Sequence, residues 1–117
     1  MKNDTFNYKP LYRHYAQIII EMPAKVAKLK KRATSMKREE FTSHEFILCL
    51  AQKYQADYIH ALYYWRAKAP SEPFRMLHGI LAQRLHHETL IRWIREVPDD
   101  LDIFDNPAPC AVWGRVP

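Results

Sequence analysis

Six histidines and two cysteines are the residues of this chain that could bind a metal ion. Metal sites on a helix need ligands three or four residues apart, because only those side chains share a face. No two of these residues have that spacing, and the sequence has no C-x-x-C motif. We therefore predict no metal site and no cofactor. The histidines are expected to be structural or surface residues: His14, His44, His60, His78, His86 and His87.

Nucleophilic catalysis would require a serine or cysteine beside a histidine and an acid, but the sequence contains no nucleophile-elbow or catalytic-cysteine motif. The only glycines, Gly79 and Gly114, are too few for a glycine-rich phosphate-binding loop. Cys49 and Cys110 are too few for a disulfide framework, and we expect both thiols to be reduced. The prediction is a protein that is not an enzyme and has no catalytic residues.

The stretch PAKVAKLKKRATSMKREEF, residues 23–41, has the strongest charge pattern in the chain. Residues 25–38 carry a charge of +7 without one acidic side chain, whereas the whole chain carries +5. Apolar residues recur there at steps of three and four, which predicts an amphipathic helix with a narrow apolar stripe. Lys28, Lys31 and Arg32 are expected opposite that stripe. The predicted binding residues are the seven cations of this helix: Lys25, Lys28, Lys30, Lys31, Arg32, Lys37 and Arg38.

A basic surface of this kind predicts binding to the phosphate backbone of DNA or RNA, and a pI near 9.3 agrees with it. Residues 25–38 include no aromatic side chain, so stacking on single-stranded bases is not indicated. No helix-turn-helix signature is present, so base-specific recognition is not expected. The first interpretation is therefore a small accessory or regulatory protein that binds nucleic acid with low specificity.

The alternative is a protein-binding adaptor or inhibitor that docks on an acidic protein surface or on a nuclease complex. Small helical accessory proteins of phages and plasmids have this general build, although this is only a fold-level analogy. The many Tyr, Trp and Arg side chains would then serve as interface anchors. Binding to a membrane is not predicted, because the apolar stripe is thin and has no Trp or Phe. A homodimer remains open, and the polar N-terminus MKNDTFNYKP predicts a cytoplasmic location.

Helical periodicity predicts the elements that would carry these residues. A first helix is expected over about 10–22, with a kink or restart at Pro23, which lacks a backbone donor. Thr42 and Glu45 have the spacing of a capping box, which predicts that the next helix begins there. That helix is expected to run as one central element to about residue 65, with Leu50, Tyr54 and Leu62 in the core.

The stretch APSEPF, residues 69–74, reads as a loop with Ser71 as the N-cap of a last helix over 72–96. The apolar phase slips within that helix, so we expect a break near HHET, residues 86–89. Four aspartates and four prolines predict an irregular tail over residues 98–117. The sequence therefore predicts a single all-α domain, with four or five helices over residues 1–97 and an irregular acidic, Pro-rich C-terminal tail over residues 98–117.

Overall fold

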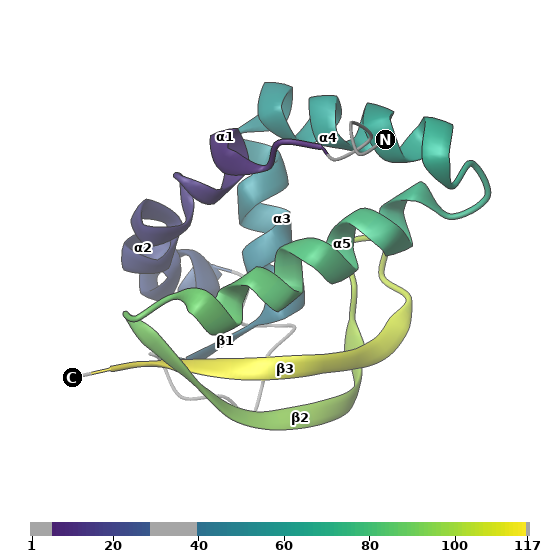
Figure 1. Cartoon of the computed structure of the whole chain (residues 1–117). Coiled ribbons are helices and arrows are strands. Elements are labelled where there is room, and N and C mark those ends of the chain that lie inside the picture. The colour runs from purple at the N-terminus through teal and green to yellow at the C-terminus, as the bar shows by residue number, and fades with distance from the viewer. Residues whose placement is uncertain (1–5, 29–39, 117) are drawn as a thin grey trace.

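The structure is a computed structural model that describes residues 6–28 and 40–116, without the side chains of residues 23–28. Helices pack on a three-stranded antiparallel sheet, so the all-α prediction is wrong (Figure 1). The helices are α1 (Lys9–Tyr12), α2 (Tyr15–Lys28), α3 (Ser43–Lys53), α4 (Gln55–Lys68) and α5 (Pro73–Arg84), followed by a 3₁₀ turn (Leu85–His87). The strands are β1 (Glu40–Thr42), β2 (Ile91–Leu101) and β3 (Pro107–Arg115), in the spatial order β1-β3-β2.

The two long strands occupy the region where the sequence predicted the end of a helix and an irregular tail. Strand β2 is rich in branched and aromatic residues, which favour strands when a neighbour is available to pair with. Strand β3 is the central strand of the sheet. It can contain Pro107 and Pro109 because β1 pairs only with the segment Val112 to Gly114. Both prolines therefore lie where β3 has a neighbour on one side only, so their missing donors need not interrupt a ladder.

The capping box is confirmed at the start of α3. The amide of Glu45 donates to Thr42 Oγ1 at 3.1 Å, and the Glu45 carboxylate accepts from the amide of Thr42 at 2.8 Å. The helix does not run on to residue 65, because it ends at Lys53 and α4 starts at Gln55. Tyr54 between them has φ −122° and ψ 58°, which is not helical.

Two further boundaries differ from the prediction and one agrees with it. The N-terminal interruption lies between α1 and α2, and α2 continues through Pro23 as far as Lys28. Helix α5 has Glu72 rather than Ser71 at its N-cap, without a side-chain capping bond. The predicted break near residues 86–89 is confirmed, since α5 ends at Arg84 and β2 begins at Ile91.

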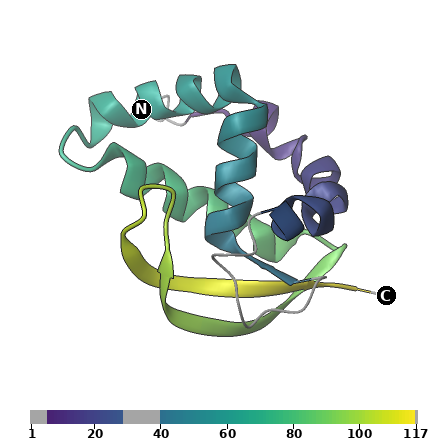
Figure 2. The same cartoon turned by 180° about the vertical axis from the view of Figure 1, so that it is seen from behind.

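The core lies between the helices and one face of the sheet (Figure 2). Leu50 of α3 is fully buried, as predicted, whereas Tyr54 and Leu62 are partly buried against the core. The hydroxyl of Tyr15 donates to the backbone oxygen of Leu81 at 2.6 Å and so ties α2 to α5. The largest fully buried side chains are Trp113, Tyr15, Phe41, Phe46, Leu11, Ile18, Ile19, Met22, Ile47, Leu50, Leu77 and Leu81. Within the described ranges, every helix is too short or too polar to cross a lipid bilayer.

Candidate functional site

The predicted basic site falls almost entirely outside the described residues. Lys25 and Lys28 belong to the last turns of α2, where the backbone alone is described. The other five predicted cations, Lys30, Lys31, Arg32, Lys37 and Arg38, lie outside the described residues. The structure therefore places the start of the basic segment on α2.

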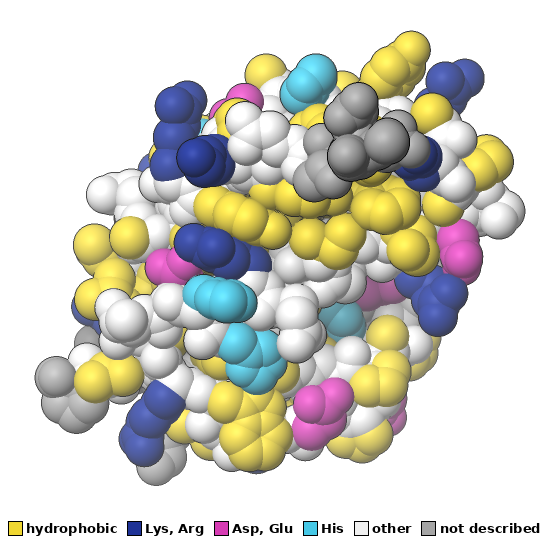
Figure 3. Space-filling view, viewed as in Figure 1, with side chains coloured by type: hydrophobic (Ala, Val, Ile, Leu, Met, Phe, Trp, Pro, Cys, Tyr) yellow, Lys and Arg dark blue, Asp and Glu magenta, His cyan; other side chains and the backbone are white. Residues whose placement is uncertain are grey.

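Four cations of the described part, Lys53, Arg75, Arg84 and Arg95, lie beside acidic side chains. Lys53 Nζ lies 2.6 Å from Glu21 Oε1, and Arg75 Nη1 lies 2.7 Å from Glu72 Oε1. Arg95 lies 3.3 Å from the carboxylate of Glu40. On the face shown in Figure 3, Lys and Arg side chains are scattered rather than gathered into one patch.

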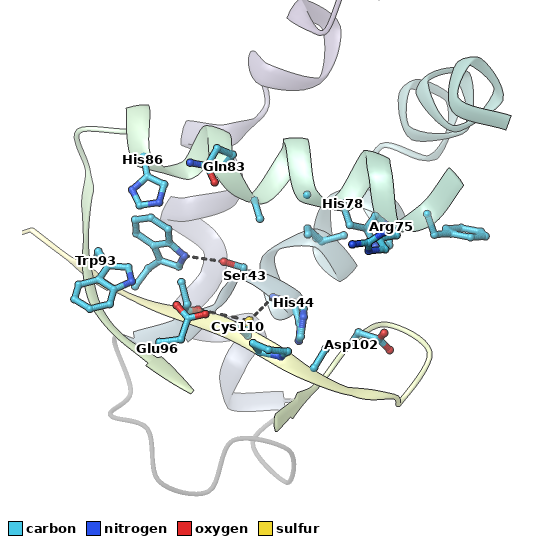
Figure 4. A pocket seen from close by; sticks show the side chains of 18 of the residues that line it. Ser43, His44, Arg75, His78, Gln83, His86, Trp93, Glu96, Asp102 and Cys110 are labelled. Atoms are coloured by element: carbon cyan, nitrogen blue, oxygen red, sulfur yellow. Dashed lines mark hydrogen bonds between the residues drawn. The ribbon is translucent and has the colours of Figure 1, made fainter. Parts of the chain in front are cut away.

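A pocket of about 640 Å³ lies between α5, the start of α3 and the β2–β3 hairpin (Figure 4). The pocket is lined by aromatic side chains and by residues that can donate or accept hydrogen bonds or can titrate. The aromatic residues are Phe74, Trp93, Phe104 and Trp113, and the polar or titratable residues are Ser43, His44, Arg75, His78, Gln83, His86, Glu96, Asp102 and Cys110.

Trp113 joins the pocket to the core. The indole N–H of Trp113 donates to Ser43 Oγ at 2.9 Å, and His86 packs against its ring with centroids 4.8 Å apart. Trp93 is the residue paired with Trp113 across the two strands, yet half of its surface is exposed. Trp113 therefore connects α3 to the sheet, and Trp93 forms an accessible edge of the pocket.

His44, Asp100 and Cys110 meet beside this pocket from three different elements. His44 Nδ1 lies 3.1 Å from Asp100 Oδ2, and the backbone N–H of His44 donates to Cys110 Sγ at 3.3 Å. One ligand atom from each residue lies within 4.8 Å of the other two. The side chains of His44 and Asp100 are about 16% and 15% exposed, and Cys110 is buried.

An irregularity in β2 brings Asp100 to this cluster. Val97 pairs with Cys110, but Asp100, three residues further along β2, pairs with Ala108, two residues back along β3. The extra residue in β2 reverses its alternation of side chains. Asp100 therefore lies on the same face of the hairpin as Cys110, whereas a regular ladder would turn it to the opposite face.

The Cys110 thiol is not set up as a free nucleophile. Burial raises its pKa to about 11, although the N–H of His44 donates to the sulfur. The thiol is therefore protonated at neutral pH, and thiolate attack needs the ionised form. The protonated sulfur can act as a hydrogen-bond partner. After losing its proton, the sulfur can act as a metal ligand.

His78 and Asp102 are two further titratable residues near the cluster. The imidazole Nε2 of His78 lies 2.6 Å from the hydroxyl of Tyr58. Burial lowers the pKa of His78 to about 4, while the carboxylate of Asp102 acts in the opposite direction. Burial alone would raise the pKa of Asp102, but N–H groups of Asn106 and Phe104 hold it below its usual value. A neutral imidazole thus faces an ionised carboxylate.

No local motif in the sequence indicates this cluster. Its members are separated by 56 residues between His44 and Asp100, so no local spacing exists to detect. Cys110 and Asp100 also lay in the segment predicted to be irregular. The usable signal was the continuous apolar run of residues 110–113, which is typical of a buried strand and follows a segment with several aspartates.

No protein-family model, no curated protein and no solved structure matches this chain.

The buried imidazole predicts acid sensitivity. The unfolded chain takes up a proton at His78 near pH 6.5, whereas the folded chain does so only near pH 4. The contribution of His78 to the free energy of unfolding should therefore fall as the pH is lowered from 6.5 to 4 and level off below that range. This fall should be on the order of 3 kcal/mol, because the pKa of His78 differs by about two and a half tenfold steps in proton affinity, and each step corresponds to about 1.4 kcal/mol.

His78→Gln is the matched variant, since glutamine can still bond to the Tyr58 hydroxyl but does not titrate. Urea unfolding of both proteins from pH 7 to pH 4 measures the difference. Parallel pH profiles would show that His78 is not held neutral by the fold.

Proposed function

We propose that this protein is a non-catalytic module that binds the phosphate backbone of nucleic acids through residues 25–38. The observation that supports this proposal is the concentration of charge. Residues 25–38 carry a charge of +7. Because the net charge of the whole chain is +5, the remaining residues together carry −2. Counterion release by clustered Lys and Arg gives affinity that depends little on base sequence.

Helix α2, which contains the start of this segment, is packed into the core. Helix α2 continues without interruption to Lys28, so it includes the first cations of the segment. Upstream in the same helix, Ile18, Ile19 and Met22 are fully buried. The basic segment therefore begins on a helix that is anchored in the core.

Four aspartates near the end of β2 lie far from that helix. The turn joining β2 to β3 includes Asp102 and Asp105, with Asp99 and Asp100 just before it. Helix α2 and this turn lie at opposite ends of the molecule in both views (Figures 1 and 2). Such polarity would orient the protein on a polyanion, with α2 toward the phosphates and the acidic turn away from them.

Binding to random-sequence duplex DNA, single-stranded DNA and RNA tests the proposal. We expect fluorescence anisotropy to show binding at low salt and a linear fall of log affinity with log salt concentration. Different duplex sequences should bind alike, since the proposal includes no base contacts. Absence of binding at low salt would contradict it.

A second candidate is a protein-binding adaptor, and exposed apolar residues on α4 favour it. Ile59 and Tyr63 are 59% and 66% exposed and lie one helical turn apart. The guanidinium of Arg66 lies 6.0 Å from the Tyr63 ring centre. Aromatic and arginine side chains are frequent anchors of protein interfaces. An acidic protein that is captured from a lysate by wild type but not by Tyr63→Ala would support this function.

A cytoplasmic location is part of the same proposal. Cys49 and Cys110 are both buried free thiols, as expected in a reducing compartment.

A further inference from the structure

We propose that His44, Asp100 and Cys110 form a binding site for a zinc ion beside the pocket. The site is independent of the basic segment. It would hold the start of α3 and the β2–β3 hairpin together, and it would present one open coordination position.

The donor atoms match this metal. An imidazole nitrogen, a carboxylate oxygen and a thiolate are the three kinds of ligand that zinc takes in proteins. Magnesium and calcium prefer oxygen ligands alone, so the sulfur of Cys110 disfavours them. Ligand atoms about 2.0 to 2.3 Å from a tetrahedral ion lie about 3.3 to 3.8 Å from one another. The three atoms here already lie within 4.8 Å of one another, so small side-chain movements would complete the geometry.

The backbone around the cluster is built to hold these groups in position. The capping box of Thr42 and Glu45 fixes the first turn of α3, and His44 lies in that turn. The irregularity in β2 places Asp100 on the face of Cys110, although regular pairing would turn it away. Irregularities of this kind are frequent beside functional sites because they redirect one side chain.

One neighbour of the sulfur, the backbone N–H of His44, favours its metal-bound form. The backbone N–H of His44 donates to Cys110 Sγ at 3.3 Å (Figure 4). Such a donor stabilises a thiolate more than a thiol, because a hydrogen bond to a charged acceptor is stronger. When the ion binds, the Cys110 S–H proton passes to solvent, a zinc–sulfur bond forms, and the ion releases a water molecule. The hydrogen bond between His44 Nδ1 and Asp100 is replaced by two bonds to the ion, each of which displaces a further water molecule, and the ring proton of His44 then resides on Nε2.

The fourth position faces the pocket. His44 and Cys110 both line it, and the pocket has a volume of about 640 Å³. Three protein ligands with one open position allow the ion to hold a water molecule or a small anionic group. The aromatic rim formed by Phe74, Trp93 and Phe104 would border such a ligand.

Titration of the metal-free full-length protein with Co²⁺ tests the site, since cobalt is a spectroscopic substitute for zinc. We expect one equivalent to bind and to produce a sulfur-to-cobalt charge-transfer band in the near ultraviolet. Added Zn²⁺ should abolish the band, and Mg²⁺ should not. Binding should also release one proton, measured in a weakly buffered solution with an indicator dye.

Variants separate this site from other histidines and cysteines. Cys110→Ser should lose the charge-transfer band, while Cys49→Ser, which changes the other buried thiol, should keep it. Asp100→Asn keeps size and partial exposure, so it should fold as wild type does and bind Co²⁺ at least tenfold more weakly. His87→Ala removes an exposed histidine and should bind as wild type does.

The outcomes are distinct. A band that disappears in Cys110→Ser and weakens in folded Asp100→Asn supports the site. If wild type binds no cobalt, or if folded Asp100→Asn and Cys110→Ser bind as tightly as wild type, the proposal is wrong. Far-ultraviolet circular dichroism of each variant shows whether it is folded.

Discussion

Trp113→Ala is expected to lower the free energy of unfolding by about 3 to 5 kcal/mol, the usual cost of removing a large buried aromatic side chain. Trp113 is only 2% exposed and lies on the central strand β3. The substitution opens a cavity between α3 and the sheet. It also removes the donor of the 2.9 Å bond to Ser43, whose side chain is left in a buried environment.

Trp93→Ala is the matched control for that experiment. Trp93 is the cross-strand partner of Trp113, but it is 50% exposed. Its removal should change the free energy of unfolding by about 1 kcal/mol or less. Urea unfolding of the two variants measures both values. Similar losses for the two tryptophans would mean that β3 does not cover the core as described.

The features that the sequence predicted correctly are local. The capping box at Thr42 and Glu45 requires only two residues three positions apart, and it is present as predicted. The break after α5 was visible because Leu85 and Leu90 fall on different helical faces. Signals of this kind do not depend on what the rest of the chain does.

The sheet was missed because its stabilisation is not local. Strand β2 has apolar residues that fit a short helical turn as well as a strand, and only pairing with β3 selects the strand. Pro107 and Pro109 argued against a strand in β3. They are tolerated because β1 pairs only with the segment Val112 to Gly114, further along β3.

The histidine–aspartate–cysteine cluster was missed for the same reason. Metal ligands on one helix lie three or four residues apart, and no two histidine or cysteine residues of the sequence have that spacing. His44 and Cys110 meet only after the sheet has formed, and Asp100 joins them only because β2 has an extra residue in its ladder. Neither condition can be read from spacing along the chain.

Replacing Lys28, Lys31 and Arg32 by Ala should have the largest effect on binding. Each phosphate that is neutralised on a duplex contributes about −0.9 to the slope of log affinity against log salt concentration. The triple variant should therefore flatten the slope by roughly two to three, and it should weaken binding by about a hundredfold near 0.1 M salt. Its thermal unfolding should be close to wild type, because these cations are predicted to be exposed.

A second triple variant controls for total charge. Lys9, Arg66 and Arg92 are exposed and belong to α1, α4 and β2, outside the basic segment. Their replacement by Ala removes the same three charges from other parts of the molecule. It should lower affinity only slightly, through the weaker long-range field.

The slope of log duplex affinity against log salt concentration, measured for wild type and both triple variants, tests the central claim most directly. We predict a slope that is flatter by two to three in the Lys28, Lys31 and Arg32 variant and nearly unchanged in the Lys9, Arg66 and Arg92 variant. Equal slopes in wild type and the folded Lys28, Lys31 and Arg32 variant would contradict the claim that residues 25–38 bind nucleic acid.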